Sequence, residues 1–358
     1  MNELACLVQE TADRLAGRHT GAVVAGLAGG DVEIRGAGRT GPGGGVPGPR
    51  TLFEIGSVTK VFTSLVLARL ALDGAVRLDE PLAELLTGPV AGPARGRGAV
   101  PARGPEPITL RHLATHTSGL PRLPRGMAVR SLLSPNTTDP YADCTAERVL
   151  DGLARTRLRS APGRGFRYSN LGAGLLGLAL AQRSGVGYEE LVAREVCAPL
   201  GLADTCVRPD EERSARLAQG HTPGGRPVPA WNFAALPGMG GLRSTAADLV
   251  VFLRAQLAAE REPDAPLSPA IALTRETRHR VNPFAWTHLG WLGHRLHTQQ
   301  GGHLQIWHNG GTGGFRSFVA FDPEKRVGAV VLVNTRRSAD PAGTALLRRL
   351  QNGFATTG

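Results

Sequence analysis

Lysine is scarce in this sequence. Of its 41 basic residues only two are lysines, Lys60 and Lys325, and all the others are arginines. Arginine stays protonated in a protein, whereas a partly desolvated lysine can give up its proton. A lysine retained against so strong a bias toward arginine therefore suggests proton chemistry. Lys325 lies in the run Asp-Pro-Glu-Lys-Arg, which is typical of a solvated turn, so the chemical interest lies in Lys60.

Long apolar runs are absent as well. No stretch approaches the roughly 20 apolar residues of a membrane-spanning helix. The N-terminal segment carries acids early and reads as an amphipathic helix, without the basic start and small-residue cleavage site of a signal peptide. These absences predict a cytoplasmic protein with no membrane partner. In that compartment the four scattered cysteines are expected to be reduced and structural.

Metal-binding and nucleic-acid-binding patterns are missing too. The cysteines are too far apart for a zinc site, and the histidines between residues 288 and 303 lack the i, i+4 spacing of helical metal ligands, so we expect no metal and no cofactor. Aromatic residues make up only 5% of the chain and the arginines are dispersed, which argues against nucleic acid. The formal charge of +11 has two interpretations: arginine spread over the surface by codon bias, or a basic face that steers an acidic partner such as a carrier protein.

The order of predicted elements indicates a single sheet built from both ends of the chain. Apolar periodicity predicts helices at 3–18, 57–72, 109–116, 145–155, 170–184, 187–196, 245–259 and 341–350. Strands are predicted at 21–27, 31–35, 52–55, 304–307, 315–321 and 327–333. Strands at both ends with helices between them favour an α+β fold in which a helical region is inserted into the sheet.

The first motif with chemical meaning is Ser57-Val-Thr-Lys60. Gly56 allows a turn from strand to helix, which places Ser57 at a helix N-terminus, where free N–H groups favour negative charge. Lys60 follows one helical turn later on the same face. The pair predicts a serine nucleophile with an amine that helps to take its proton. A serine cap followed by an exposed lysine is the alternative.

The second motif is Tyr168-Ser-Asn170, which contains one of only three tyrosines in the chain. A phenol beside an ammonium group can be pushed toward phenolate, because the positive neighbour favours the charged form. Tyr168 is therefore a candidate general base for Ser57, with Lys60 as its electrostatic partner. The Asn170 amide can orient a substrate carbonyl. A simple helix cap would explain the same residues.

The third motif, His308-Asn-Gly310-Gly311, is predicted to end a strand. Glycines at a strand edge let a substrate backbone come close and leave N–H groups free to bind an oxyanion. A hairpin turn with a surface histidine is the alternative.

Taken together and in this order, the three motifs resemble those of the serine β-lactamase-like family of β-lactamases, penicillin-binding proteins, esterases and acyltransferases. Ser57-Val-Thr-Lys60 resembles the family's S-x-x-K, and Tyr168-Ser-Asn170 its Y-x-N. His308-Asn-Gly310 is similar to the H-x-G that esterase-like members carry where β-lactamases have K-T-G. Residues 108–121 and 238–248 resemble framing segments of the family, and we expect structural roles for His116 and Asp248 within them.

This resemblance implies a β-lactamase/transpeptidase-like fold with an antiparallel sheet, flanking helices and an all-helical lobe. It further implies a single unit over residues 1–358, with an α/β lobe at about 1–78 and 228–358 and a helical lobe at about 79–227. The active site would lie between the lobes, and the N–H groups of Ser57 and Gly311 would form the oxyanion hole.

The motifs and the family together predict a serine hydrolase or transacylase that forms an acyl-enzyme from a small-molecule ester, thioester or amide. The acyl group would pass to water or to an amine or alcohol acceptor, and an acidic carrier protein is a candidate donor. D-peptidase or β-lactamase activity is an alternative, although the expected location and His308 in place of lysine argue against it. A non-catalytic sensor or binder that is acylated once is a second alternative.

Overall fold

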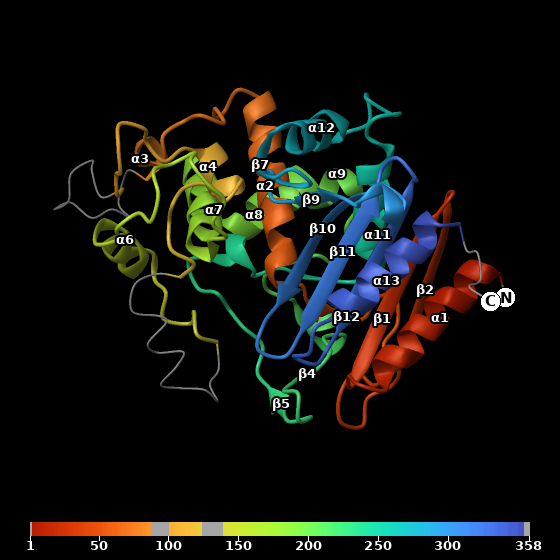
Figure 1. The fold of residues 1–358 in the computed structure, drawn as a ribbon. Helices are drawn as coiled ribbons and strands as arrows, with labels where there is room; N and C mark the ends of the chain where they lie inside the picture. The colour runs from red at the N-terminus through yellow and green to blue at the C-terminus, as the bar shows by residue number, and fades with distance from the viewer. Residues whose placement is uncertain (1, 87–99, 124–138, 354–358) are drawn as a thin grey trace.

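An eight-stranded antiparallel sheet forms the centre of the protein (Figure 1). The computed structural model describes residues 2–86, 100–123 and 139–353. In spatial order the strands are β2 (Asp31–Gly38), β1 (Gly21–Ala28), β12 (Val327–Val333), β11 (Arg316–Asp322), β10 (Leu304–Gly311), β9 (Leu292–Arg295), β8 (Ala285–His288) and β7 (Arg278–Asn282). Because β1 pairs directly with β12, the prediction of one sheet built from both ends of the chain is confirmed.

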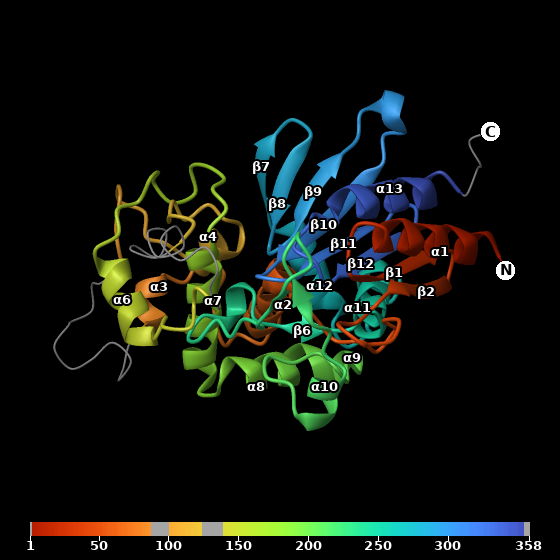
Figure 2. The same ribbon diagram turned by 90° about the horizontal axis from the view of Figure 1, so that it is seen from below.

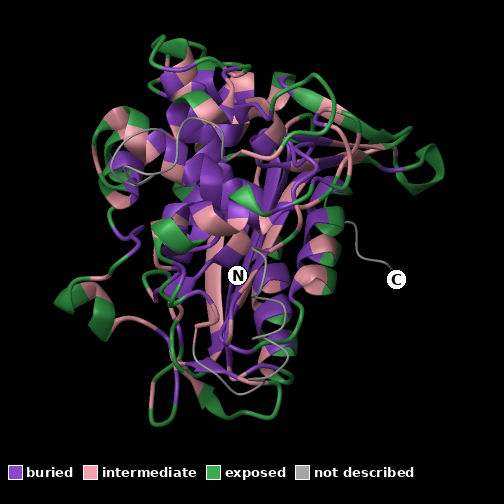
Figure 3. Ribbon diagram, turned by 90° about the vertical axis from the view of Figure 1, so that its left-hand side faces the viewer, coloured by how far each residue is buried: buried purple, intermediate pink, exposed green. Residues whose placement is uncertain are grey.

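Helices cover both faces of this sheet (Figure 2). On one face lie α1 (Glu3–Ala16) and α13 (Asp340–Gln351), and on the other lie α2 (Thr59–Leu72), α11 (Ala246–Ala258) and α12 (Ser268–Glu276). Strand β12 is buried along its whole length, and its side chains alternate between two separate apolar clusters, one for each face. Figure 3 shows this buried centre between helices whose outer sides are exposed.

The predicted α+β fold with flanking helices and a helical region is confirmed. The helical region contains α3 (Leu82–Leu85), α4 (Leu110–Ala114), α6 (Ala146–Ala154), α7 (Asn170–Ser184), α8 (Tyr188–Val192), a π-helical turn (Ala193–Cys197), α9 (Ala198–Leu200) and α10 (Glu211–Ala215). The predicted lobe boundaries stay a prediction. No helix among residues 2–86, 100–123 and 139–353 is long and apolar enough to cross a membrane.

Two small two-stranded sheets lie outside the main sheet. One pairs β3 (Phe53–Glu54) with β6 (Arg243–Ser244), and the other pairs β4 (Gly220–His221) with β5 (Pro227–Val228). Short 3-10 turns at Gly56–Val58 and Pro237–Met239 follow β3 and precede β6, respectively. The four cysteines are free thiols, and all but Cys6 are buried.

Two parts of the sheet differ from the sequence predictions. Strands β7 to β9 and helix α12 were not predicted, because the β7 segment is mostly exposed and rich in arginine and histidine, without an apolar alternation. Strand β10 was predicted to end at residue 307, but it continues to Gly311. The third motif, which was predicted to end a strand, forms the last residues of β10.

Candidate active site

Ser57 sits in a tight turn pressed against the end of β10. Gly56 has a φ of 50°, a conformation that favours glycine, and a Cβ built there would lie 2.5 Å from the Gly311 nitrogen. Gly310 is equally constrained, since a Cβ there would lie 2.0 Å from the Ile55 carbonyl oxygen. The backbone contact between these glycines brings the first and third motifs together, with Ser57 partly exposed.

Lys60 is buried directly behind Ser57, with 2% of its surface exposed. Its Nζ lies 2.9 Å from Ser57 Oγ and 2.5 Å from the Met239 carbonyl oxygen. Burial, and after it the positive charge of Arg122, holds the pKa of Lys60 well below its usual value. A neutral amine at this position can accept the proton of the Ser57 hydroxyl, because the two groups are already in hydrogen-bond contact.

Tyr168 stands on the other side of Ser57 and forms a hydrogen bond with it. The Lys60 ammonium nitrogen lies 5.1 Å from the centroid of the Tyr168 ring, and the Arg122 guanidinium carbon 5.5 Å from it. Burial raises the pKa of Tyr168 to about 12, although the hydrogen bond from Ser57 and the charge of Arg122 oppose this. This direction is opposite to the lowered phenol pKa expected from the sequence. It favours a protonated Tyr168, with Lys60 as the first proton acceptor.

Asn170 begins helix α7 beside the same cleft. The preceding Ser169 caps the helix through its Oγ, which accepts the Gly172 N–H at 2.9 Å. The Asn170 side chain hydrogen-bonds to the hydroxyl of Tyr141, and its Oδ1 is buried without a partner among the described residues. A buried amide oxygen that lacks a donor is suited to accept an N–H from a bound substrate.

The end of β10 presents a free N–H group toward Ser57. Thr312 N donates to the Phe315 carbonyl oxygen across the hairpin, so the next pair, Gly311 with Arg316, is a non-hydrogen-bonded pair of the ladder. The Gly311 N–H therefore points away from β11. On that side the pairing of β10 with β9 has already ended at Trp307. Together with the Ser57 N–H, this group forms a candidate oxyanion hole.

His308 is fully buried in β10 and lies near Tyr168, with 6.1 Å between the ring centroids. Burial, followed by the charge of Lys60, lowers the pKa of His308 to about 3, so the imidazole is neutral at ordinary pH. Its Nδ1 is 2.6 Å from the Asn309 carbonyl oxygen and donates to it, which leaves Nε2 as an acceptor. Nε2 has no partner among the described residues.

His116, for which we expected a structural role, also lies beside Tyr168. Its ring centroid is 4.4 Å from that of Tyr168, and its backbone φ is 57°, which is uncommon for a residue with a side chain. Nδ1 accepts the Ser169 N–H at 3.3 Å, so the proton lies on Nε2, which is buried and unpartnered within the described part of the chain. Asp248, by contrast, accepts bonds from Asp204 N and Thr205 Oγ1, which is a structural arrangement.

The structure thus brings the seven predicted site residues together around Ser57, and it adds four neighbours that sequence reasoning missed: Glu54, Arg122, Tyr141 and Trp231. The scarcity of tyrosine could have identified Tyr141, since two of the chain's three tyrosines lie here. No cluster of three or more metal-binding side chains occurs among the described residues.

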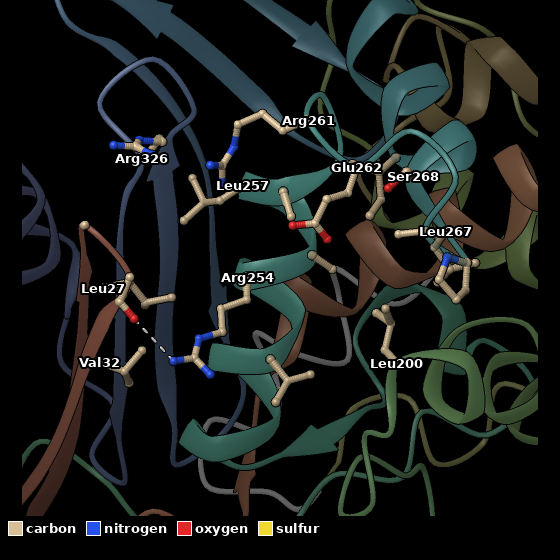
Figure 4. Close-up of a pocket in the computed structure, with 18 of the residues that line it drawn as sticks. Leu27, Val32, Leu200, Arg254, Leu257, Arg261, Glu262, Leu267, Ser268 and Arg326 are labelled. Atoms are coloured by element: carbon tan, nitrogen blue, oxygen red, sulfur yellow. Dashed lines mark hydrogen bonds between the residues drawn. The ribbon is translucent and has the colours of Figure 1, made fainter.

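A separate hollow of about 520 Å³ lies between the β1–β2 turn, α11 and α12 (Figure 4). Its walls are largely apolar, and Arg254, Arg261 and Arg326 stand around it. None of the three motifs contributes a residue to it. Asp31 and Glu262 line it as well, so its charge is mixed, and the acidic partner expected from the sequence stays a prediction.

The chain matches the model of the Beta-lactamase family over residues 7–353 and belongs to this family of serine β-lactamase-like hydrolases. It is 32% identical over 325 residues to the D-alanyl-D-alanine-carboxypeptidase/endopeptidase AmpH of Escherichia coli, covering 88% of this chain and 79% of that protein. It is 28% identical to a β-lactamase of Pseudomonas fluorescens, with 79% of each chain covered. A β-lactamase/D-alanine carboxypeptidase from Yersinia pestis, solved with citrate, superposes with a TM-score of 0.75 at 28% identity, covering 97% of this chain and 99% of that one.

Proposed function

We propose that this protein hydrolyses an ester or amide through an acyl-enzyme on Ser57. The observation that carries the proposal is the contact of 2.9 Å between Ser57 Oγ and the buried Nζ of Lys60. Burial lowers the pKa of that amine well below that of an exposed lysine, which favours the neutral form that can act as a base. The hydrolases among the relatives support hydrolysis over transfer to an amine or alcohol acceptor.

In the proposed mechanism, Lys60 takes the Ser57 proton as Oγ attacks the substrate carbonyl. The N–H groups of Ser57 and Gly311 stabilise the oxyanion, and loss of one such donor typically costs about 10²–10³ in rate. The leaving group departs with a proton supplied through Tyr168, which is protonated and hydrogen-bonded to Ser57. Water then attacks the acyl-enzyme, the Lys60–Tyr168 pair takes its proton, and the pair passes a proton to Ser57 Oγ as the bond to the acyl group breaks.

His308 supports a restriction on the substrate. The imidazole is buried and neutral, so it supplies no fixed positive charge for a substrate carboxylate at this position. We therefore favour simple esters and amides over β-lactams. Thioester donors, an acidic carrier and a cytoplasmic location stay predictions.

The test is hydrolysis of p-nitrophenyl acetate and butyrate by wild type and by Ser57→Ala, with intact-protein mass spectrometry during turnover. We expect an acyl adduct on the wild type, and neither adduct nor turnover in Ser57→Ala. More than a few per cent of wild-type activity in the variant would remove Ser57 from its role. A single burst of product without steady turnover would instead support the alternative of a sensor that is acylated once.

A further inference from the structure

A second hollow, of about 540 Å³, lies between α1 and α13 and is called here the α1–α13 hollow. These two helices lie side by side on the sheet face opposite α2 (Figure 1). The sheet therefore separates the hollow from Ser57 and Lys60. Its volume is within the range of small-molecule binding sites, about 300–1,000 Å³.

The floor of the α1–α13 hollow is apolar. Leu7 and Leu15 of α1 and Leu346 of α13 are its buried floor residues. Pro341 and Ala345 are exposed and continue the apolar surface along α13. An aliphatic chain that lies on such a surface removes apolar area from water, on its own side and on that of the protein, which favours its binding.

Arginines surround this apolar floor. Arg14 and Arg18 come from α1, Arg349 comes from α13 and Arg337 precedes α13, and all four are exposed. Arg349 lies 3.9 Å from Glu10, whereas the guanidinium groups of Arg14 and Arg18 form no ion pair within the described part of the chain. Among the described residues no Asp or Glu lines the hollow, in contrast to the hollow of Figure 4. The rim is therefore positively charged.

His19 shows that this positive charge acts inside the hollow. Its ring lines the hollow and is 7% exposed, and its Nδ1 is buried without a partner among the residues that the structure describes. Burial, followed by the charges of Arg337 and Arg18, lowers the pKa of His19 to about 4, although a hydrogen bond with the Thr335 backbone opposes this. The charges that disfavour a proton on His19 favour an anion beside it. A buried ring nitrogen without a partner is also typical of a site that a ligand completes.

We propose that the α1–α13 hollow is a second ligand site, which binds a monomeric amphipathic anion of the medium-chain aliphatic carboxylate class. The carboxylate lies beside Arg18 and Arg337, and the chain lies on the leucine floor. Arginine suits this role because its planar guanidinium can donate two parallel hydrogen bonds to one carboxylate. The inference does not depend on the proposed acyl-enzyme chemistry, because none of the three motifs contributes a residue to the hollow.

The experiment is isothermal titration calorimetry of the whole protein with decanoate, below the concentration at which decanoate forms micelles. We expect decanoate to bind, and both acetate, which lacks the chain, and decanol, which lacks the charge, to bind at least about tenfold more weakly. Arg18→Gln should weaken decanoate binding by about tenfold or more, the usual effect of losing a charge-assisted hydrogen bond. The matched control Arg348→Gln removes an exposed arginine of α13 that does not line the hollow, and should leave the affinity unchanged.

A second variant locates the site without a change of charge. Ala345 is exposed and lines the hollow, so a tryptophan at this position would occupy the hollow without entering the core. We expect Ala345→Trp to abolish decanoate binding and to keep the thermal midpoint of the wild type. Decanoate that binds at Ser57 instead would still bind to this variant.

The proposal would be overturned if the wild type does not bind decanoate, or if it binds decanoate and decanol equally well. Unchanged affinity in Arg18→Gln or in Ala345→Trp would overturn it as well. Binding to phosphatidylglycerol vesicles without binding to monomeric decanoate would assign the arginines to a membrane surface and not to this site. Calorimetry needs no turnover, so a failure of the proposed esterase activity is distinguishable from a failure of this site.

Discussion

The cleft and the opposite side of the sheet differ in the kinds of buried group that they contain. The outer layer, meaning α1, α13 and the sheet face they cover, is a cluster of apolar side chains such as Val8, Val331 and Leu347. The cleft holds a buried amine, two neutral imidazoles with unpartnered nitrogens, and backbone in disfavoured conformations at His116 and Phe233. Unpartnered polar atoms and disfavoured backbone conformations thus occur where chemistry is expected, whereas the outer layer stabilises the fold by apolar packing.

The largest expected effect is a fall in catalytic rate without a loss of folding stability, and it concerns Lys60. In Lys60→Met we expect turnover of p-nitrophenyl acetate to fall by about 10²–10⁴-fold, the usual contribution of a positioned base. Because a buried amine is costly to desolvate, the thermal midpoint should stay equal or rise. Steady-state kinetics and thermal unfolding measure the two quantities. A variant that unfolds at lower temperature but keeps its rate would contradict the comparison.

The converse effect is expected in the outer layer. Leu347, which is 1% exposed, packs against this sheet face, so Leu347→Ala should lower the free energy of unfolding by about 2–5 kcal/mol. The rate per folded molecule should not change at 25 °C. Urea unfolding monitored together with esterase activity tests this. A change in kcat well below the unfolding transition would show that the two regions are coupled.

A change at Gly310 should affect both catalytic rate and stability, because this residue lies where the cleft meets the sheet. In Gly310→Ala the new methyl group would push against the Ile55 carbonyl oxygen, and overpacking of this kind costs about 1–3 kcal/mol. We expect loss of both stability and rate, since the same movement displaces the turn that carries Ser57. Ala329→Gly, in the outer layer, is a control of similar size that should affect only stability.

A smaller effect is expected in the pH dependence. The charge of Arg122 lowers the pKa of Lys60, so Arg122→Gln should let that pKa rise. Activity requires the neutral amine, so the acidic limb of the kcat/KM profile should move to higher pH. Added salt should move the wild-type profile in the same direction. Arg278→Gln, which removes a similarly exposed arginine over Trp286, is the matched control and should leave the limb in place.

The residue types of the site could be predicted from the sequence, but the burial and the protonation states of these residues could not. Scarcity identified Lys60 and Tyr168, and glycine spacing identified Gly310 and Gly311. The pKa of Tyr168 was predicted in the wrong direction, because desolvation by burial raises it and outweighs the positive charge of Arg122, which lowers it. A pattern of neighbours along the sequence cannot reveal how much water a phenol loses.

Helices and strands could be predicted where packing in the core requires a regular spacing of apolar residues. The strands at 21–27 and 327–333 and the helix at 341–350 lie within a few residues of their predicted bounds, because apolar contacts fix them. Strands β7 to β9 escaped prediction because β7 is largely exposed and β8 buries polar residues such as Thr287 and His288, so the segment lacks an apolar alternation. The contact between Tyr141 and Trp231 escaped prediction as well, since these two residues meet only in three dimensions.

The pairing of β1 with β12 has a consequence for how the chain folds. Ala22 lies opposite Val333, so this edge of the β1–β2 hairpin stays unpaired until β12 at residues 327–333 has been synthesised. Contacts between residues so distant in sequence slow folding, and an unpaired apolar strand edge invites association with other chains. We therefore expect the nascent protein to be most prone to aggregation before its last strand emerges from the ribosome, and to depend on chaperones during that interval.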